Sequence, residues 1–181
     1  MIYLDTNILV SLRIGDGNTV VAEEWFAQQF APFAISAWVI AEFIGHVGLR
    51  VRKGEVSLRN SARIIEAFDE AVATNLSMLK ADDSTILHSS MWLRDAHCSL
   101  QPADALHLAI AHTAGATTLA TFDERFAKAA QKLKLANLKI VLIGGKLRRV
   151  EQARAAYRVA KPTNRAAVVE KTTKTKKKVR R

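Results

Sequence analysis

The sequence lacks the features that mark secreted and membrane proteins. It has a single cysteine, Cys98, which cannot form an internal disulfide, and this fits a reducing compartment better than secretion. The apolar stretch at residues 31–41 is well short of the roughly 18 residues that cross a bilayer, and an acid at position 5 is atypical of a signal peptide. We therefore expect a cytoplasmic protein without a membrane segment.

Acidic residues are scarce near the end of the chain. Residues 1–145 hold 13 Lys and Arg against 15 Asp and Glu, a net charge of −2. Residues 146–181 hold 14 basic and 2 acidic residues, a net charge of +12, so this segment supplies the whole positive excess of the chain, whose total is +10. The final run, KTTKTKKKVRR, has almost nothing to bury. We predict one domain over residues 1–145 and a basic, partly disordered extension over residues 146–181. That extension is either a solubility tail or a segment attracted to polyphosphate.

Short apolar segments alternate with helical patterns along the predicted domain. The first strand stops at Asp5, and further strands are predicted at residues 33–35, 76–79, 117–121 and 139–143. Helices are predicted between them, at residues 19–30, 37–54, 57–73, 84–96, 102–115 and 123–133. This alternation predicts a three-layer α/β/α sandwich with a short central parallel sheet. In such folds functional residues gather beyond the carboxyl ends of the strands.

Three acids lie where a strand ends or a helix begins, and each has an ordinary explanation. Asp5 is able to start a turn by accepting hydrogen bonds from nearby backbone amides. Asp104 follows Pro102 in the first turn of a helix, where an acid complements the helix dipole. Asp123 is a candidate cap for the helix after it. Taken singly, none of the three requires a functional role.

Glu42 is harder to explain by local structure. It lies within AWVIAEFIGHVG, an almost wholly apolar helix, where a capping role is excluded. A buried carboxylate without a partner costs several kcal/mol, so Glu42 must be ion-paired, protonated or bound to a cation. Arg50 and Arg52 are too far along the same helix for an i,i+4 pair, whereas His46 is at that spacing. A salt bridge from another element remains an alternative.

The four acids together indicate a metal site. Two strand-end carboxylates, one on an apolar helix and one at a helix start can converge above the same edge of a parallel sheet. Four carboxylates in contact do not all stay ionised at pH 7 unless a cation neutralises them. Ligation by oxygens alone suits Mg²⁺ or Mn²⁺, which keep several water ligands.

Four motifs in order, LDTN at 4–7, a Glu in the second apolar helix, PADALHLA at 102–109 and TFDERF at 121–126, resemble those of PIN-domain ribonucleases. The resemblance is strongest to VapC-like toxins of bacterial toxin–antitoxin pairs, and it covers about residues 1–145. It implies a PIN-like fold and an acidic metal-binding quartet with three supporting polar residues. The quartet is Asp5, Glu42, Asp104 and Asp123, and the supporting residues are Thr6, Asn7 and Thr121.

The same resemblance implies an activity and partners. The activity is hydrolysis of RNA phosphodiester bonds by water activated on Mg²⁺ or Mn²⁺, with Asp5 and Asp104 as direct ligands. Asp123 would bind a metal directly or through water, and Glu42 would ligate metal or orient the attacking water. The implied partners are a second copy of the chain, forming a homodimer, and a cognate antitoxin protein that covers the acidic site.

Other interpretations of the same residues remain. Phosphatases that end the first strand in Asp-x-Asp would need an acid where Asn7 stands. A non-catalytic PIN-like module that binds nucleic acid through residues 146–181 is the main alternative to an enzyme. None of the five histidines forms a recognised zinc-ligand pair with Cys98, and His107, three residues after Asp104, is expected to be an ordinary helix-face histidine.

Overall fold

The computed structural model describes residues 1–95 and 97–144. In chain order its elements are β1 (Ile2–Leu4), α1 (Thr6–Arg13), α2 (Thr19–Ala27), β2 (Phe33–Ser36), α3 (Ala37–Arg52), α4 (Leu58–Asn75), β3 (Leu76–Leu79), α5 (Asp83–Leu93), α6 (Pro102–Thr113), β4 (Thr118–Thr121), α7 (Glu124–Lys132) and β5 (Lys139–Leu142). The predictions made for residues 146–181 lie outside the described part of the chain. No helix in that part is both long and apolar enough to cross a membrane.

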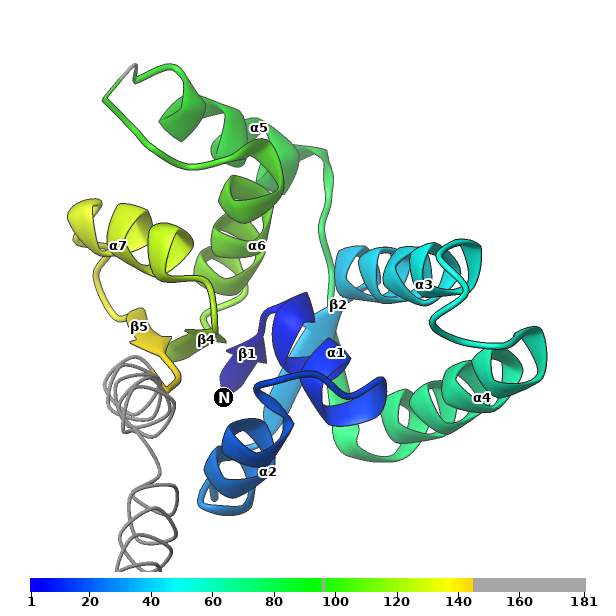
Figure 1. Ribbon diagram of the computed structural model, residues 1–181. Helices are drawn as coiled ribbons and strands as arrows, with labels where there is room; N and C mark the ends of the chain where they lie inside the picture. Colours follow the sequence, from blue (N-terminus) through cyan, green and yellow to red (C-terminus); the bar gives the residue numbers. More distant parts are fainter. Residues whose placement is uncertain (96, 145–181) are drawn as a thin grey trace, which may run out of the picture. The chain divides into compact units, whose positions relative to one another are not determined.

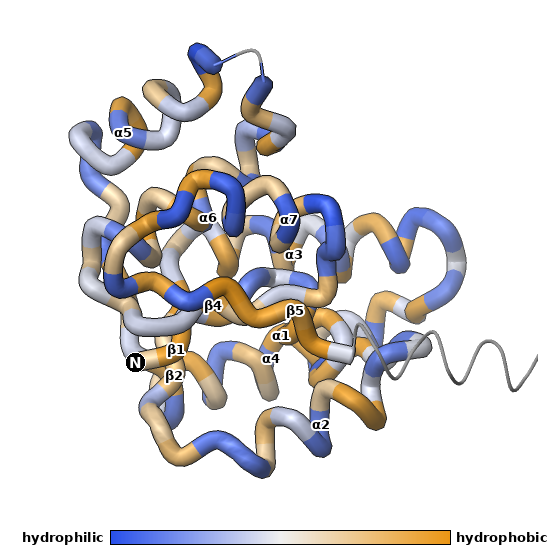
Figure 2. The backbone as a smooth tube through the Cα atoms, turned by 90° about the vertical axis from the view of Figure 1, so that its left-hand side faces the viewer, coloured by the Kyte–Doolittle hydropathy of each residue, from blue (hydrophilic) through white to orange (hydrophobic). Residues whose placement is uncertain are grey.

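The strands form one parallel sheet in the order β3-β2-β1-β4-β5. Figure 2 shows α6 and α7 on one side of β4 and β5, and α1, α2 and α4 on the other. The predicted three-layer α/β/α sandwich is therefore confirmed. Because β1 is central, with β2 on one side and β4 on the other, the residue that follows β1 lies in the middle of the sheet's carboxyl edge (Figure 1).

The core consists of apolar side chains from the strands and from the helix faces that cover them. Tyr3 and Leu4 of β1 are completely buried, and the rings of Phe43 and Phe68 stack at a centroid distance of 3.9 Å between α3 and α4. In Figure 2 the strand segments β4 and β5 are largely orange, the colour of hydrophobic residues. The central strands β1, β2 and β4 are buried along almost their whole length, and this explains why they appear in the sequence as short continuous runs with few charges.

Capping residues fix where the helices begin and end. Ser36 accepts a hydrogen bond from the Val39 amide at the start of α3, as predicted. Gly115 ends α6 with a φ of +70°, a conformation that favours glycine, and it too is at the predicted position. The predicted helix at residues 84–96 instead spans Asp83–Leu93, because Asp82 accepts the Thr85 amide and starts it earlier.

Helix α1 was not predicted. Its sequence, TNILVSLR, places apolar residues at three successive positions, and this resembles a strand more than an amphipathic helix. Ile8, Leu9 and Val10 are all buried, so the helix is covered on most of its circumference. It begins immediately after Asp5, and this turns the chain away from the sheet at its carboxyl edge.

Helices α5 and α6 pack against each other through a group of aromatic rings. The His88 and Trp92 rings of α5 lie edge to face at a centroid distance of 4.9 Å, and the His112 ring of α6 lies 5.8 Å from His88. Burial lowers the pKa of His112, and the nearby His88 charge lowers it further. A proton on His112 is therefore less favourable in the folded chain than in the unfolded one.

We predict that this contact weakens on acidification. Below the unfolded pKa of about 6.5 the unfolded chain binds more protons at His112 than the folded chain does, so stability is complete above that pH and falls below it. Between about pH 8 and pH 5.5 the melting temperature of the parent should fall more than that of His112→Gln. Thermal unfolding followed by circular dichroism at both pH values measures the difference.

Exposed His97 provides the control. The His97→Gln variant should follow the parent at both pH values, because the change removes a histidine without touching the α5–α6 contact. If His112→Gln and His97→Gln have the same pH dependence, the proposed role of His112 is wrong.

Candidate metal centre

Asp5 is fixed in place at the carboxyl end of β1. Its amide donates to the Ala120 carbonyl of β4 at 3.0 Å, and this holds the backbone against the sheet as the chain enters α1. Its Oδ2 accepts hydrogen bonds from Asn7 Nδ2 and Thr121 Oγ1, both at 2.6 Å. Its Oδ1 lies 3.6 Å from His107 Nε2. One carboxylate oxygen is thus held by the protein, and the other faces the remaining ligand-type groups.

Asn7 and Thr121 also join the ends of β1 and β4. Asn7 Nδ2 donates to Thr121 Oγ1 at 3.0 Å, while Asn7 Oδ1 accepts the Phe122 amide at 3.1 Å. Thr121 Oγ1 accepts the Asp123 amide at 2.9 Å. The structure therefore places both predicted supporting residues in contact with Asp5, where they restrict the orientation of its carboxylate.

Glu42 projects from the second turn of α3 toward Asp5. Its Oε2 accepts one hydrogen bond from Thr6 Oγ1 at 2.5 Å and another from His107 Nε2 at 2.8 Å. The sequence left open whether Glu42 pairs with a basic group from another element, and His107 of α6 is that group. Thr6, the third predicted supporting residue, begins α1 and contacts Glu42 rather than Asp5.

The expectation that His107 is an ordinary helix-face histidine is wrong. Its side chain is only 3% exposed and donates to Glu42, and Nδ1 on the other edge of the ring lies 3.0 Å from the Tyr3 hydroxyl. Tyr3 in turn lies 2.9 Å from Ser36 Oγ, the cap of α3. The one signal in the sequence was its position three residues after Asp104, which places both on one side of α6.

Burial and mutual charge determine the protonation of this group. Burial raises the pKa of Asp5, and the negative charge of Glu42 adds to that effect, while His107 and Thr121 oppose it. Burial also acts to raise the pKa of Glu42, but its hydrogen bond with His107 and the charge of His107 outweigh this and lower the pKa. Burial acts to lower the pKa of His107, but the bond to Glu42 and the charge of Asp5 raise it. The protonation of His107 and that of the two carboxylates therefore depend on one another.

Asp104 lies in the first turn of α6, as predicted, and its Oδ2 accepts the Gln101 amide at 3.4 Å. Burial raises its pKa, and the negative charges of Asp123 and Asp5 raise it further. The structure thus brings Asp104 within electrostatic range of two other members of the predicted quartet.

Asp123 caps α7, as predicted, with Oδ1 accepting the amides of Arg125 and Phe126 at 2.7 and 3.0 Å. The ordinary explanation of this residue therefore holds locally. It does not exclude a second role, because the capping bonds are made by Oδ1 alone. Asp123 and Asp5 are joined through Thr121 Oγ1, which donates to the Asp5 carboxylate and accepts the Asp123 amide.

Asp5, Glu42 and His107 are close enough to bind one ion. Each offers a ligand atom within 4.8 Å of the other two, and among residues 1–95 and 97–144 this is the one group of three or more such residues. Asp104 and Asp123 are outside it. The oxygen-rich donors fit a hard divalent cation such as Mg²⁺, which takes few protein ligands and keeps water in its other positions. We refer to Asp5, Glu42, Asp104 and Asp123, together with His107, as the acidic centre.

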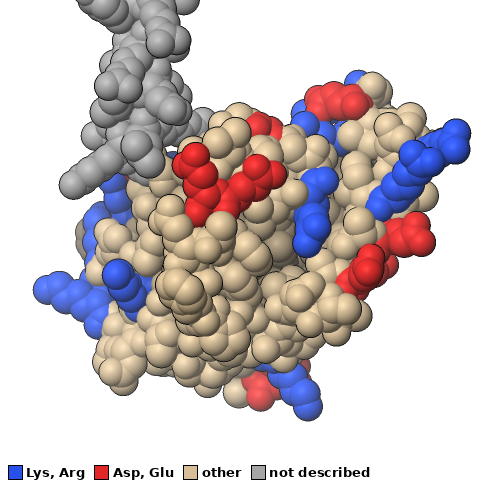
Figure 3. All heavy atoms as spheres, turned by 90° about the horizontal axis from the view of Figure 1, so that it is seen from below, with Lys and Arg blue, Asp and Glu red and all other residues tan. Residues whose placement is uncertain are grey.

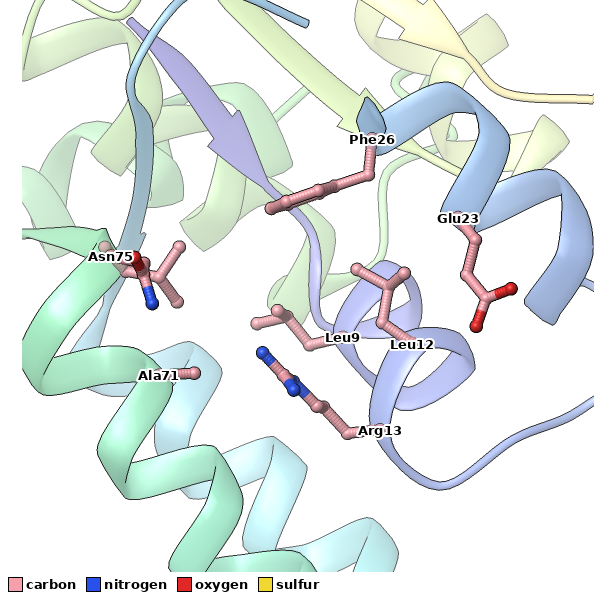
Figure 4. Close-up of a pocket in the computed structure, with 8 residues that line it drawn as sticks. Leu9, Leu12, Arg13, Glu23, Phe26, Ala71 and Asn75 are labelled. Atoms are coloured by element: carbon pink, nitrogen blue, oxygen red, sulfur yellow. The ribbon is translucent and has the colours of Figure 1, made fainter. Parts of the chain in front are cut away.

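A pocket of about 270 Å³ lies farther along α1, between α1, α2 and α4. Figure 4 shows the Arg13 side chain pointing across this pocket toward α4, and Phe26 of α2 closing another side. Its lining is mostly apolar and consists of Leu9, Leu12, Arg13, Glu23, Phe26, Ala71, Asn75 and Leu76. The pocket shares no residue with the acidic centre, so it is a candidate contact for a partner rather than for the metal.

Comparisons with known proteins give a family and a fold. A family model described as the PIN domain matches residues 2–132. The structure of the sarcin–ricin loop cleaving toxin VapC20 from Mycobacterium tuberculosis aligns with a TM-score of 0.57 and 19% identity, covering 71% of this chain and 95% of that one. VapBC-1 from nontypeable Haemophilus influenzae aligns at 0.54 and 24%, covering 78% and 98%. No curated protein sequence matches the chain.

We predict that the Tyr3 hydroxyl stabilises the centre. Tyr3→Phe keeps the buried ring but leaves His107 Nδ1 without its hydrogen-bond partner, so the free energy of unfolding should fall by about 1–3 kcal/mol. Urea unfolding with an unchanged m-value measures this change. Ser61→Ala, which removes an exposed hydroxyl bonded to the Leu58 carbonyl, is the control and should stay within about 0.5 kcal/mol of the parent. Equal losses in the two variants would contradict a role for the Tyr3 network.

Proposed function

Because the chain belongs to the PIN-domain family, we propose that it is a metal-dependent endoribonuclease that hydrolyses RNA phosphodiester bonds, as the toxin of a toxin–antitoxin pair. The observation that carries the proposal is the proximity of Asp5 and Glu42, two carboxylates from distant parts of the sequence with ligand oxygens within 4.8 Å of each other. Burying two such groups together is unfavourable without a cation. A protein that needed these residues only for its fold would be more stable with apolar ones.

We propose that Asp5 and Glu42 hold Mg²⁺ or Mn²⁺, with Asp104 and Asp123 bound directly or through water. A divalent ion there would supply polarisation of the phosphoryl oxygen and a lower pKa for attacking water. Asp5 presents Oδ1 because Asn7 and Thr121 hold its Oδ2. Water would be the nucleophile in this reaction, so no protein side chain is needed for that role.

Thr6 and His107 would orient Glu42. Both bond to its Oε2, so its Oε1 is the oxygen left to face an ion or a water molecule. Thr6 belongs to α1 and His107 to α6, so two different helices fix the Glu42 carboxylate of α3. Such positioning reduces the reorganisation needed when substrate binds.

For regulation we propose a cognate antitoxin protein. An arginine from that partner would pair with the carboxylates of the acidic centre in the place of metal or substrate. The apolar pocket lined by Leu9, Leu12 and Phe26 would take an apolar side chain of the same partner. A solved relative in fold is VapBC2 from Rickettsia felis bound to a DNA fragment from their promoter, at a TM-score of 0.54 and 20% identity, covering 79% of this chain and 99% of that one.

We predict that cleavage requires both the metal and Asp5. The parent should cleave defined RNAs in the presence of Mg²⁺ or Mn²⁺ and stop when a chelator is added. Asp5→Asn keeps the side-chain shape but removes the charge, so kcat/KM should fall by at least about 100-fold, as expected for a direct metal ligand. Cleavage of end-labelled RNA followed on denaturing gels gives these rates.

Asp69→Asn is the matched control, because Asp69 is exposed on α4. It should cleave at the parental rate. Equal cleavage by the parent and Asp5→Asn, or cleavage indifferent to chelator, would refute the proposed chemistry, and no cleavage of any RNA by the parent would favour the non-catalytic binding module.

We predict that the antitoxin forms a stable complex that blocks cleavage. Native mass spectrometry of the chain produced together with the product of its neighbouring gene should detect a hetero-oligomer. Leu12→Glu, which places a charge in the apolar pocket, should weaken the complex by at least about tenfold while leaving cleavage by the free chain unchanged. A chain that remains alone in the presence of that gene product would contradict this partner.

A further inference from the structure

One face of α3 runs from the acidic centre to a group of basic side chains. Glu42, His46, Arg50 and Lys53 are separated by steps of four, four and three residues, so they lie along the same side of the helix. His46 is near enough to Glu42 that its charge lowers the pKa of that carboxylate. We call His46, Arg50 and Lys53 the α3 track.

The α3 track lines a polar hollow of about 380 Å³. Its walls are His46, Leu49, Arg50, Lys53 and Glu55, and none of these residues belongs to the acidic centre. The hollow is open, and the His46 and Lys53 side chains are exposed. It is thus a concave and mainly basic surface on the same side of the helix as Glu42.

Local hydrogen bonds and ion pairs do not occupy all the donor groups of the basic residues in the α3 track. The last turn of α3 is capped by backbone amides, since Arg50 O accepts the amides of Glu55 and Val56 and Leu49 O accepts that of Lys53. Arg50 Nη1 pairs with Glu55 at 3.3 Å, and this orients its guanidinium while leaving other donors available. Within the described residues Lys53 has no ion-pair partner. The helix dipole accounts for basic residues at this end, but not for the hollow between them.

We propose that the α3 track binds the backbone phosphates of the RNA strand on one side of the cleavage site. This inference rests on the proposed ribonuclease function and adds to it the path of the substrate. At a rise of 1.5 Å per residue, His46 and Arg50 lie about 6 and 12 Å along the helix from Glu42, and Lys53 about 16 Å. A strand whose scissile phosphate is at the acidic centre would place its next phosphates along these side chains.

A strand fits the α3 track better than a small anion does. The basic residues are spread over about 10 Å of helix from His46 to Lys53, an extended arrangement that an extended polyanion can follow. A polyanion contacts them in sequence and gains from counterion release at each contact. The track contacts only the backbone, so it contributes affinity and register rather than base specificity.

The negative charge of the acidic centre is the reason that RNA binding would need basic residues nearby. Residues 1–145 carry a net charge of −2, and the carboxylates repel RNA until metal is bound. On the face drawn in Figure 3 the Lys and Arg side chains stand in separate groups around a largely uncharged middle. Basic residues close to the centre, such as those of the α3 track, would hold the strand against the repulsion by the carboxylates.

A substrate-length series tests the path of the strand. A defined RNA that the parent cleaves at one position is shortened one nucleotide at a time from either end, and kcat and KM are measured for each length. For the parent, KM should rise as nucleotides over the α3 track are removed from one side. For Arg50→Ala/Lys53→Ala with long RNA, KM should be raised about tenfold or more, whereas kcat should be nearly unchanged. In this variant KM should no longer depend on the number of nucleotides on the side of the cleavage site that lies over the α3 track.

Lys132→Ala/Lys139→Ala is the matched control. It removes the same charge, but Lys132 ends α7 and Lys139 begins β5, at the amino edge of the sheet away from the acidic centre. Its KM should keep the parental dependence on length. If the two double variants behave alike, the effect is one of total charge and the proposed track is wrong.

A binding experiment separates this inference from the proposed function. The Asp5→Asn protein is titrated with a labelled single-stranded RNA of about 20 nucleotides in chelator at several salt concentrations. Adding Arg50→Ala/Lys53→Ala should reduce the slope of log affinity against log salt by about 1.4, whereas Lys132→Ala/Lys139→Ala should not. A parent that never cleaves RNA would refute the nuclease without testing the track, whereas an unchanged slope here would refute RNA binding by the α3 track.

Discussion

The proximity of the buried Asp5 carboxylate to that of Glu42, with ligand oxygens within 4.8 Å of each other, is the constraint around which this structure is organised. Two negative charges so close in a poorly solvated place are costly, and every neighbouring polar group acts to reduce that cost. Thr121 and Asn7 bond one carboxylate, Thr6 bonds the other, and His107 lies between them. The hydrogen-bond network continues through Tyr3 to the cap of α3, so the centre and the fold stabilise each other.

The sequence predicted the sheet and most helices because their signals are local. Short runs of three to five mainly uncharged residues marked the strands, Ser36 marked the start of one helix and Gly115 the end of another. Helix α1 was not predicted because Ile8, Leu9 and Val10 are all buried. A helix that is buried on most sides does not show the alternation of apolar and polar residues by which a helix is detected in a sequence. Its identity as a helix depends on tertiary packing, which a single sequence does not display.

The acidic centre was predictable in part, for a related reason. Glu42 was conspicuous because a carboxylate in an apolar helix needs a partner, but the partner itself is set by how α3 and α6 pack. His107 has apolar neighbours in the sequence and no recognised ligand spacing, so its role becomes visible only in three dimensions. Asp104 and Asp123 illustrate the opposite case, since both lie at the start of a helix, as expected. In addition, the charges of Asp5 and Asp123 raise the pKa of Asp104. A capping role therefore does not count against a role in the centre, because one carboxylate has two oxygens.

Helix α3 sets distances in this protein that loops could not hold. Its first turn is tied to β1 through the bond between Ser36 and Tyr3, and one turn later Glu42 enters the centre. From there the backbone rises by a fixed amount per residue to Gly54, whose φ of +73° ends the helix. Any strand of phosphates that meets both Glu42 and Lys53 must match that spacing. On the proposed path of the RNA, this rigid helix would convert the position of the Glu42 carboxylate into a register for the substrate, and the caps at both ends of α3 would preserve that register.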